Sequence, residues 1–363
     1  MSPLHIGFVF DLRDDYLAMG HTIEDVAEFD SVETIEAIES TLVRLGHRVE
    51  RVGHGRELAR RLVAGERFDL VFSIAEGLKG RSREAQVPAL CELFGQAYAF
   101  SDPLTMAVTL DKAVAKRIVR DAGIPTAPFL VFERAGQDLS RWSHYPAFVK
   151  PLAEGTGKGC EKASMVDDEA ALRAAAEHIL TRYAQPALVE SYLPGREFTV
   201  GVLGTGDDAR VVGVMEIVLL ADADAGVYSL RNKEECQHLV TYHRGEDAEA
   251  RRAGERALAA HRALGCRDAA RHDLRSDASG EPVFLEVNPI AGLHPTHSDL
   301  PILSDLHGLG YEALIEQIVG NAARRNGLNA ASVVSGKGNE ASAPKQKPKR
   351  ATGGTPKAKT AAR

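Results

Sequence analysis

Two strand-like segments near the end of the chain carry acidic, amide and basic side chains at alternating positions. Glu286 and Asn288 lie two residues apart in one segment, and Arg271 and Asp273 have the same spacing in the segment before it. Because successive strand residues point to opposite faces, each pair presents both side chains on one face. If the strands pair as a hairpin, the four groups gather, and such oxygen ligands suit Mg²⁺ beside phosphates. The alternative is a solvated sheet face that carries a salt bridge.

A lysine followed by a glycine-rich loop is the second signal. Lys150 ends an apolar run, and residues 154–159 have the sequence EGTGKG. Glycines let backbone N–H groups approach an anion closely, so this loop can cover phosphates. It does not match the Walker A pattern, and a plain turn is the usual explanation for a lone GxGxG. Lys112, predicted to start a helix after a polar loop, is a second candidate cation, or else an ordinary surface lysine.

The third signal is a connector between two predicted strands. Residues 190–197 have the sequence ESYLPGRE, with an acid at each end. Such a connector can present backbone N–H and C=O groups to a purine while a carboxylate binds ribose hydroxyls. The alternative is an ordinary loop between strands.

These groups need a scaffold, and the first hundred residues alternate between strand-like and helix-like patterns. Apolar runs at 4–10, 49–52 and 68–74 predict buried strands, and periodic apolar residues at 32–45 and 58–62 predict helices. Strands separated by helices indicate a parallel sheet with helices on its faces. We therefore predict a doubly wound α/β domain at the N-terminus.

The rest of the chain predicts a mixture of helices with many more strands. Strand signals dominate after residue 187. The expected helices are 111–122, 167–180, 246–264 and 311–324, and the expected strands are 129–132, 147–150, 187–190, 197–203, 210–220, 267–275 and 282–287.

The net charge of the 363-residue chain averages over two unlike parts. It is −7 in total, but residues 337–363 contain eight Lys or Arg and one Glu, a balance of +7, so the first 336 residues carry −14. Residues after about 328 are mostly Ala, Ser, Gly, Pro and Lys, which cannot bury enough surface to offset ordering entropy. We predict a disordered basic tail, either a solubilising extension with no partner or an arm that contacts a polyanion such as nucleic acid.

Composition excludes several classes of protein. With 44% hydrophobic and 26% charged residues, the chain is not expected to be disordered, collagen-like or a disulfide-stapled mini-protein. No signal peptide and no membrane-spanning run of 18 apolar residues is expected. The four cysteines are far apart without CxxC spacing, which favours the cytoplasm. The main body shows no basic–aromatic pattern, so we do not expect it to bind nucleic acid.

Taken together and in this order, the three signals resemble the ATP-grasp superfamily and, within it, the D-alanine–D-alanine ligase family. The resemblance covers residues 4–323 and is strongest at 271–301. It implies an α/β protein in which an N-terminal doubly wound parallel-sheet domain (1–103) precedes a two-subdomain ATP-grasp (α+β) fold. The central subdomain is 104–186, the C-terminal catalytic subdomain is 187–327, and the disordered basic tail is 328–363.

The resemblance also implies a carbon–nitrogen ligase. ATP phosphorylates the carboxylate of one substrate, and the amine of a second attacks the acyl phosphate, releasing ADP and phosphate. The implied ATP-binding residues are Lys112, Lys150, Glu154, Gly155, Thr156, Gly157, Glu190, Ser191, Leu193 and Glu197, with Lys233 on the γ-phosphate. The implied ligands of two Mg²⁺ ions, or of Mn²⁺, are Asp273, Glu286 and Asn288. Arg271 and Gly292 are implied to stabilise the acyl phosphate and the oxyanion, and Ser298 to meet the carboxylate of the amine-donating substrate.

The chain departs from the family where the substrates are bound. The expected GGxSxE segment is missing, and Glu28, Asp30 and Glu33 are alternatives for its glutamate. The expected His-Gly pair is replaced by Glu76 and Gly77, where Glu76 either faces a substrate pocket or caps a turn.

Two further departures lie in loops. Thr156 stands where a serine is usual, and the tyrosine expected after Lys233 is Glu234. This pattern suits substrates other than two D-alanines, another amino acid or a specialised metabolite, with D-Ala–D-Ala formation and a non-catalytic nucleotide-binding protein as alternatives. The His294/His297 pair lacks a clear third ligand, so no zinc site is expected. A homodimer is expected by resemblance alone.

Overall fold

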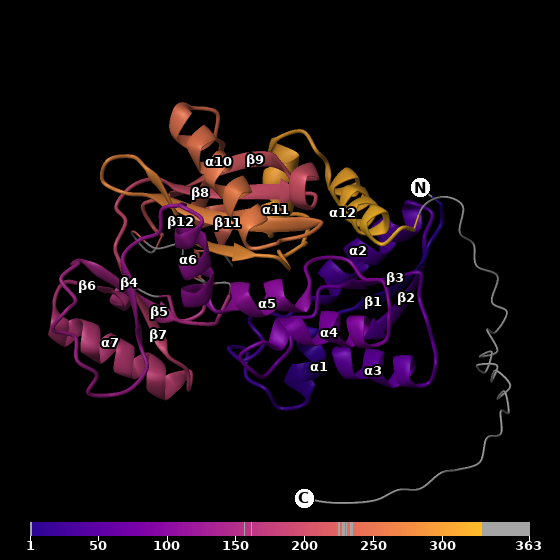
Figure 1. Ribbon diagram of the computed structural model, residues 1–363, viewed down its shortest axis with the longest axis horizontal. Coiled ribbons are helices and arrows are strands. Elements are labelled where there is room, and N and C mark those ends of the chain that lie inside the picture. The colour runs from indigo at the N-terminus through magenta and orange to yellow at the C-terminus, as the bar shows by residue number, and fades with distance from the viewer. Residues whose placement is uncertain are drawn as a thin grey trace, which may run out of the picture. The chain divides into compact units, whose positions relative to one another are not determined.

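The computed structural model describes residues 2–155, 157–160, 162–223, 226, 229, 231–232 and 235–328. These residues belong to one compact unit, residues 1–330, which contains three β-sheets (Figure 1). The predicted tail lies outside the described residues except for Leu328. The domain boundaries predicted at residues 103 and 186 remain predictions. The first strand of each of the three sheets lies in a different one of the three predicted segments.

The first sheet is parallel and has helices on both faces. Its order is β2 (Arg48–Gly53), β1 (His5–Val9), β3 (Leu70–Ser73). Helix α2 (Val32–Arg44) packs on one face, and α3 (Gly55–Val63) with α4 (Gln86–Leu93) packs on the other. Burial on both faces explains why β1 is an uninterrupted apolar run. The prediction of a doubly wound parallel-sheet domain is confirmed.

The second sheet is antiparallel, with the order β4 (Phe129–Phe132), β7 (Ala187–Ser191), β5 (Ala147–Pro151), β6 (Met165–Val166). Helix α7 (Glu169–Arg182) covers one face and closes a core of its own with Trp142. Lys150 and Glu190 therefore lie on the neighbouring strands β5 and β7, which pack against this hydrophobic core.

The third sheet has the order β10 (Val240–Arg244), β9 (Arg210–Leu219), β8 (Glu197–Leu203), β11 (Ala269–Ser276), β12 (Pro282–Asn288), all antiparallel. Helix α10 (Ala248–Ala263) lies close on one face because the side chains it buries are small. Helix α11 (Asp299–Leu306) lies on the other face, where a Cβ at Gly201 would come within 2.9 Å of Leu300 and Leu303. The two-subdomain ATP-grasp fold predicted from the resemblance is thus present.

One local prediction was wrong. Lys112 does start helix α6 (Lys112–Asp121), but the segment before it is helix α5 (Pro103–Leu110) and not a polar loop. Asp102 caps α5 by accepting from Thr105 N–H at 2.8 Å, and Asp111 caps α6 by accepting from Val114 N–H at 3.0 Å. The remaining short elements are α1 (Arg13–Ala18), α9 (Cys236–Leu239) and the 3₁₀ turns η1 (Arg83–Ala85), η2 (Lys162–Ser164) and η3 (Gly206–Asp208).

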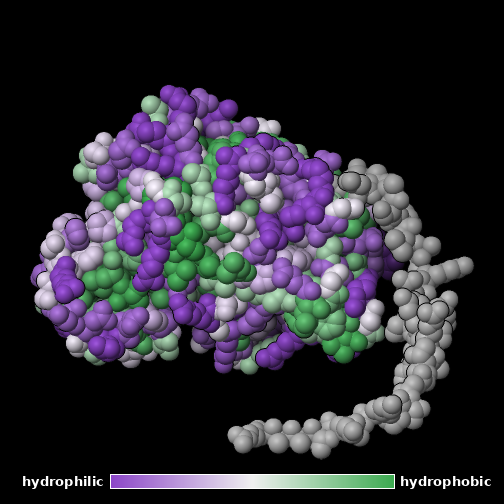
Figure 2. All heavy atoms as spheres, in the orientation of Figure 1, coloured by the Kyte–Doolittle hydropathy of each residue, from purple (hydrophilic) through white to green (hydrophobic). Residues whose placement is uncertain are grey.

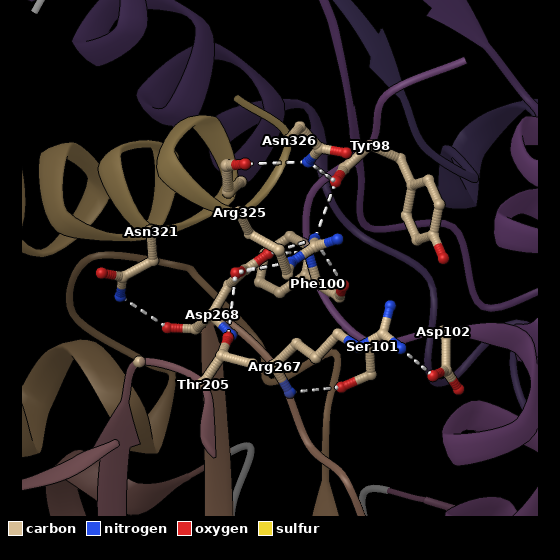
Figure 3. Close-up of polar contacts among 12 residues, drawn as sticks. Tyr98, Phe100, Ser101, Asp102, Thr205, Arg267, Asp268, Asn321, Arg325 and Asn326 are labelled. Carbon is tan, nitrogen blue, oxygen red and sulfur yellow. Dashed lines mark hydrogen bonds and ion pairs between the residues drawn. The ribbon is translucent and has the colours of Figure 1, made fainter. Parts of the chain in front are cut away.

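The last helix, α12 (Tyr311–Arg325), returns to the N-terminal sheet and lies beside α2 (Figure 1). Its end is fixed by a buried ion pair, because Arg325 Nη2 donates to Asp268 Oδ2 at 2.7 Å (Figure 3). Arg325 Nη2 also donates to the carbonyls of Tyr98 and Phe100, at 2.9 and 3.1 Å. Asp268 in turn accepts from the Phe100 N–H at 2.8 Å. These contacts join α12, the residue before β11 and the segment between α4 and α5.

The visible surface is mostly hydrophilic (Figure 2). Hydrophobic side chains gather over α3 and α4, where Val63 and Leu93 are 74% and 77% exposed. Among the described residues, none of the helices combines the length and the apolar character that crossing a membrane requires.

Candidate active site

The β11–β12 hairpin brings together the four groups with which the sequence analysis began. Asp273 pairs opposite Glu286, and Arg271 pairs opposite Asn288. Arg271 donates from Nη2 and Nε to Asp273 at 3.0 and 3.2 Å, and Thr199 Oγ1 donates to the same carboxylate at 3.1 Å. The strand period of two therefore predicted this gathering correctly.

A cleft between the second and third sheets contains most of the predicted ATP-binding residues. This inter-sheet cleft has apolar walls at Phe148 and Leu285 and carboxylates at Asp273 and Glu286. The predicted residues that line it are Lys112, Lys150, Glu154, Gly157, Glu190, Ser191, Leu193, Glu197, Asp273 and Glu286. Cys160 and Arg275 line it too and were not predicted, while Lys158 and Tyr192 lie within the loop 154–159 and the connector 190–197 that the sequence analysis singled out.

Glu190 lies between two lysines at the closed end of the inter-sheet cleft. Its two oxygens lie 2.6 Å from Lys116 Nζ and 2.8 Å from Lys150 Nζ. Burial would raise the pKa of Glu190, but the two ammonium groups outweigh it and lower the pKa. Burial would lower the pKa of Lys150, whereas Glu190 and Glu286 raise it. Lys150 thus keeps its charge beside the cleft.

Lys116 was not predicted as a site residue. It lies one turn after Lys112 on α6, is fully buried and donates to the Phe284 carbonyl at 3.0 Å. Burial lowers the pKa of Lys116, and the nearby Lys150 charge adds to this, while Glu190 opposes it. The only sequence signal was its spacing of four from Lys112, which puts both lysines on one helix face.

The Lys112 side chain contacts both the β11–β12 hairpin and the glycine-rich loop. Its Nζ donates to the Glu154 carbonyl at 2.5 Å and lies 3.5 Å from Glu286 Oε2. The Glu154 side chain accepts from Gln185 Nε2 at 2.6 Å and pairs with Lys158 at 3.1 Å. Two lysines, Lys112 and Lys158, therefore lie where the loop meets the hairpin, each beside a glutamate.

The structure separates the three acids that the sequence left as alternatives. Glu28 accepts from the Gly155 N–H and pairs with Arg83 at 2.5 Å, and Arg83 also donates to the Ala153 carbonyl at 2.8 Å. Glu28 thus connects the glycine-rich loop to the N-terminal sheet. Asp30 lines a second cavity, whereas Glu33 is exposed on α2 and lines neither cavity.

This second cavity, called here the carboxylate cavity, adjoins the same hairpin at Arg271 and Asn288. Four acids line it, namely Glu28, Asp30, Glu76 and Glu84, together with Gly155, Arg271, Asn288 and Gly292. Burial raises the pKa of the Glu84 carboxyl to about 7. Burial also raises the pKa of the Glu76 carboxyl well above its ordinary value, and the negative charge of Glu84 is the next cause. The sequence left two alternatives for Glu76, facing a substrate pocket or capping a turn. Glu76 lines this cavity, in agreement with the first.

Three predicted residues need separate mention. Thr156 and Lys233 lie outside the described residues. Ser298 precedes α11, where its Oγ accepts from the His294 N–H at 3.0 Å, and it does not line the carboxylate cavity. A Cβ at Gly292 would lie 2.7 Å from Ser298 Oγ, so this close approach requires glycine. The roles predicted for all three stay predictions.

The donor set of the hairpin fits a hard divalent cation. Asp273 and Glu286 supply carboxylate oxygens and Asn288 an amide, side by side on paired strands. Mg²⁺ prefers one or two carboxylates, with phosphates and water completing its shell. The Lys112 and Lys150 ammonium groups and the apolar walls fit a nucleotide in the same way.

Comparison with known proteins identifies the family. The family described as "D-ala D-ala ligase C-terminus" matches residues 118–320. The uncharacterized protein y4sG of Sinorhizobium fredii is 35% identical over 263 residues, 70% of this chain and 75% of that protein. The D-alanine–D-alanine ligase of a Marinomonas species is 35% identical over 270 residues, 72% and 80% of the two chains.

Solved structures agree on the fold. The Bacillus anthracis D-alanine–D-alanine ligase complexed with ATP aligns with a TM-score of 0.70 at 20% identity, covering 90% of this chain and 99% of that one. The VanG D-Ala:D-Ser ligase of Enterococcus faecalis aligns with a TM-score of 0.67 at 23% identity, covering 88% and 100%. The class of protein is thus an ATP-dependent carbon–nitrogen ligase with the ATP-grasp fold. The chain belongs to the D-alanine–D-alanine ligase family.

Proposed function

We propose that this ligase joins a small carboxylic acid to an amine through an acyl phosphate, and that at least one of its substrates is not D-alanine. The supporting observation is that one hairpin is shared by two cavities. Asp273 and Glu286 line the inter-sheet cleft. Arg271 and Asn288 line the carboxylate cavity. A nucleotide in the first and an acid in the second would meet across this hairpin.

In the proposed reaction, a carboxylate oxygen of the acid bonds to the γ-phosphorus of ATP as the bond to ADP breaks. The amine nitrogen then attacks the acyl carbon, phosphate leaves, and the nitrogen loses a proton. Lys112 and Lys150 neutralise the nucleotide phosphates, which otherwise repel the approaching carboxylate. Arg271 and the Gly292 N–H stabilise the charge that develops on the acyl oxygens. Mg²⁺, when held by the hairpin oxygens, supplies further positive charge to the transferred phosphoryl group.

The proposal that the substrates differ from two D-alanines rests on the carboxylate cavity. The family's His-Gly pair is absent, and Glu76 and Glu84 place two carboxyl groups in the lining of that cavity. D-Ala–D-Ala formation remains the alternative, and one solved relative at 23% identity is a D-Ala:D-Ser ligase. A cytoplasmic location, where ATP is available, follows from the proposal, and a homodimer stays a prediction.

A screen of substrates tests the proposal. The full chain is incubated with ATP, Mg²⁺ and pools of D- and L-amino acids, ADP release is followed, and products are identified by mass. We expect ADP release that depends on amino acids, together with a product equal in mass to two substrates less one water. Lys150→Ala and Glu286→Gln should abolish both signals. ADP release that no pool accelerates, or that both variants retain in full, would contradict the proposal.

A further inference from the structure

The carboxylate cavity is lined by four acids, and only some of them have a partner within hydrogen-bond distance. Of its four acids, Glu28 is neutralised by Arg83 at 2.5 Å and by the Gly155 N–H. The guanidinium of Arg271 is already shared between Asp273 at 3.0 Å and Asp299 at 3.5 Å. Both guanidinium groups therefore already pair with carboxylates of the protein, and neither forms an ion pair with Glu76 or Glu84 in the part of the chain that the structure describes.

Glu76 and Glu84 are the acids left over. Both line the cavity, and within the described ranges no hydrogen bond or ion pair engages either carboxylate. The positive charge of Arg83 acts on both carboxyl groups, and that of Lys112 on Glu84, but without a hydrogen bond or ion pair. The Asp30 side chain, in contrast, has Thr34 as a hydrogen-bond partner. Carboxylates set into a cavity wall without hydrogen-bond partners are costly, so they either take up a proton or bind an occupant that supplies positive charge.

The occupant that this wall suits is an organic cation and not a metal ion. A metal ion needs several ligands that converge on one point, and the described residues contain no group of three His, Cys, Asp or Glu side chains arranged to hold one. The acids instead line a cavity that Arg271 and Gly292 also line, where the acid's carboxyl group is proposed to react. A molecule with its carboxyl group beside Arg271 and Gly292 and cationic groups at Glu76 and Glu84 matches this lining.

We infer that the acid substrate carries two amino groups, and that Glu76 and Glu84 each bind one of them. This inference rests on the proposed function, because the carboxyl group is placed by the reaction. The ammonium on the carbon next to the carboxyl group balances one of the two carboxylates, and the amino group of the side chain balances the other. Charge-assisted hydrogen bonds of this kind are among the strongest that a site can make. An acid with one amino group would leave a carboxylate uncompensated unless that carboxylate held a proton.

Matched pairs of acids test the inference without knowledge of the second substrate. Hydroxylamine replaces the amine, because it converts an acyl phosphate into a coloured hydroxamate. The pairs, tested as both enantiomers, are 2,3-diaminopropionate with alanine, 2,4-diaminobutyrate with 2-aminobutyrate, ornithine with norvaline, and lysine with norleucine. We expect at least one diamino acid to exceed its partner at least tenfold in kcat/KM. This ratio is the readout, since a merely structural change would lower both members of a pair alike.

Three variants then assign the preference. Glu76→Gln and Glu84→Gln should be compared with Glu36→Gln, an exposed acid on α2 that lines neither cavity. We expect at least one of the first two to lower the ratio at least tenfold, and Glu36→Gln to leave it unchanged. Monoamino acids that react as well as their diamino partners, or a ratio that both cavity variants preserve, would overturn the inference alone. Absence of hydroxamate with every acid would overturn the proposed function, and the inference with it.

Discussion

The Lys116 ammonium lies 2.6 Å from one oxygen of Glu190, while Lys150 lies 2.8 Å from the other. The Lys116 side chain is completely buried, with 0% of its surface exposed. It therefore acts on the inter-sheet cleft only through Glu190, whose orientation it fixes from behind. We expect Lys116 to act as a positioning residue for the nucleotide.

Replacement of Lys116 by methionine keeps the apolar stem and removes the charge. We expect KM for ATP to rise about tenfold, equivalent to roughly 1.4 kcal/mol, because Glu190 loses one of two partners. The change in kcat should be smaller, and Lys116→Arg should recover part of the affinity. Steady-state kinetics at varied ATP measure this. Arg120→Met, at an exposed site on the same helix, is the control. An unchanged KM in Lys116→Met would contradict the role.

The preference for diamino acids should depend on pH. Burial raises the pKa of the Glu84 carboxyl to about 7. The charged groups that act on it are Arg83, Glu28, Lys112, Glu154 and Glu76. Below pH 7 the carboxyl is protonated and neutral, and above pH 7 it is ionised, while aliphatic amines stay protonated until about pH 10. The ratio of kcat/KM for ornithine over norvaline should therefore rise between pH 6 and 8. A ratio that stays flat over this range, or one that rises equally in Glu84→Gln, would contradict the prediction.

The ion pair that fixes α12 should contribute to stability. Arg325→Met would leave Asp268, which is 0% exposed, without its cation and would remove a donor from two backbone carbonyls. Breaking such a buried pair costs about 3 kcal/mol. We expect the thermal unfolding midpoint to fall by several degrees, as measured by circular dichroism.

Arg324→Met is the matched control for that measurement, since Arg324 is the preceding residue of the same helix and is exposed. It should leave the midpoint nearly unchanged. Equal midpoints for Arg325→Met and the native chain would show that Asp268 does not need this partner.

Sequence reasoning succeeded where a short-range pattern determines the structure. The spacing of Arg271 with Asp273, and of Glu286 with Asn288, placed each pair on one face, and pairing of the two strands then brought the faces together. Strand and helix periodicity found the parallel sheet for the same reason. In contrast, the apolar helix Pro103–Leu110 was missed although Asp102 and Pro103 form a helix start signal.

The parts that sequence reasoning could not supply depend on distant contacts. Nothing local distinguishes Lys116 from a surface lysine, because its burial comes from Glu190 and Phe284, far along the chain. The choice of Glu28 over Glu33 likewise required the Arg83 pairing and the Gly155 contact. Glu84 gained its significance only when the fold placed it beside Glu76 in one cavity.

The most direct test of the proposed acyl-phosphate reaction follows an oxygen atom. The acid that gives the highest rate of hydroxamate formation is labelled with ¹⁸O in its carboxyl group and incubated with the native chain, ATP, Mg²⁺ and hydroxylamine. Released phosphate is then analysed by mass spectrometry. If the carboxylate takes the γ-phosphoryl group before the amine attacks, one ¹⁸O atom should appear in each phosphate released. Hydroxamate formation accompanied by unlabelled phosphate would contradict the reaction proposed for this ligase.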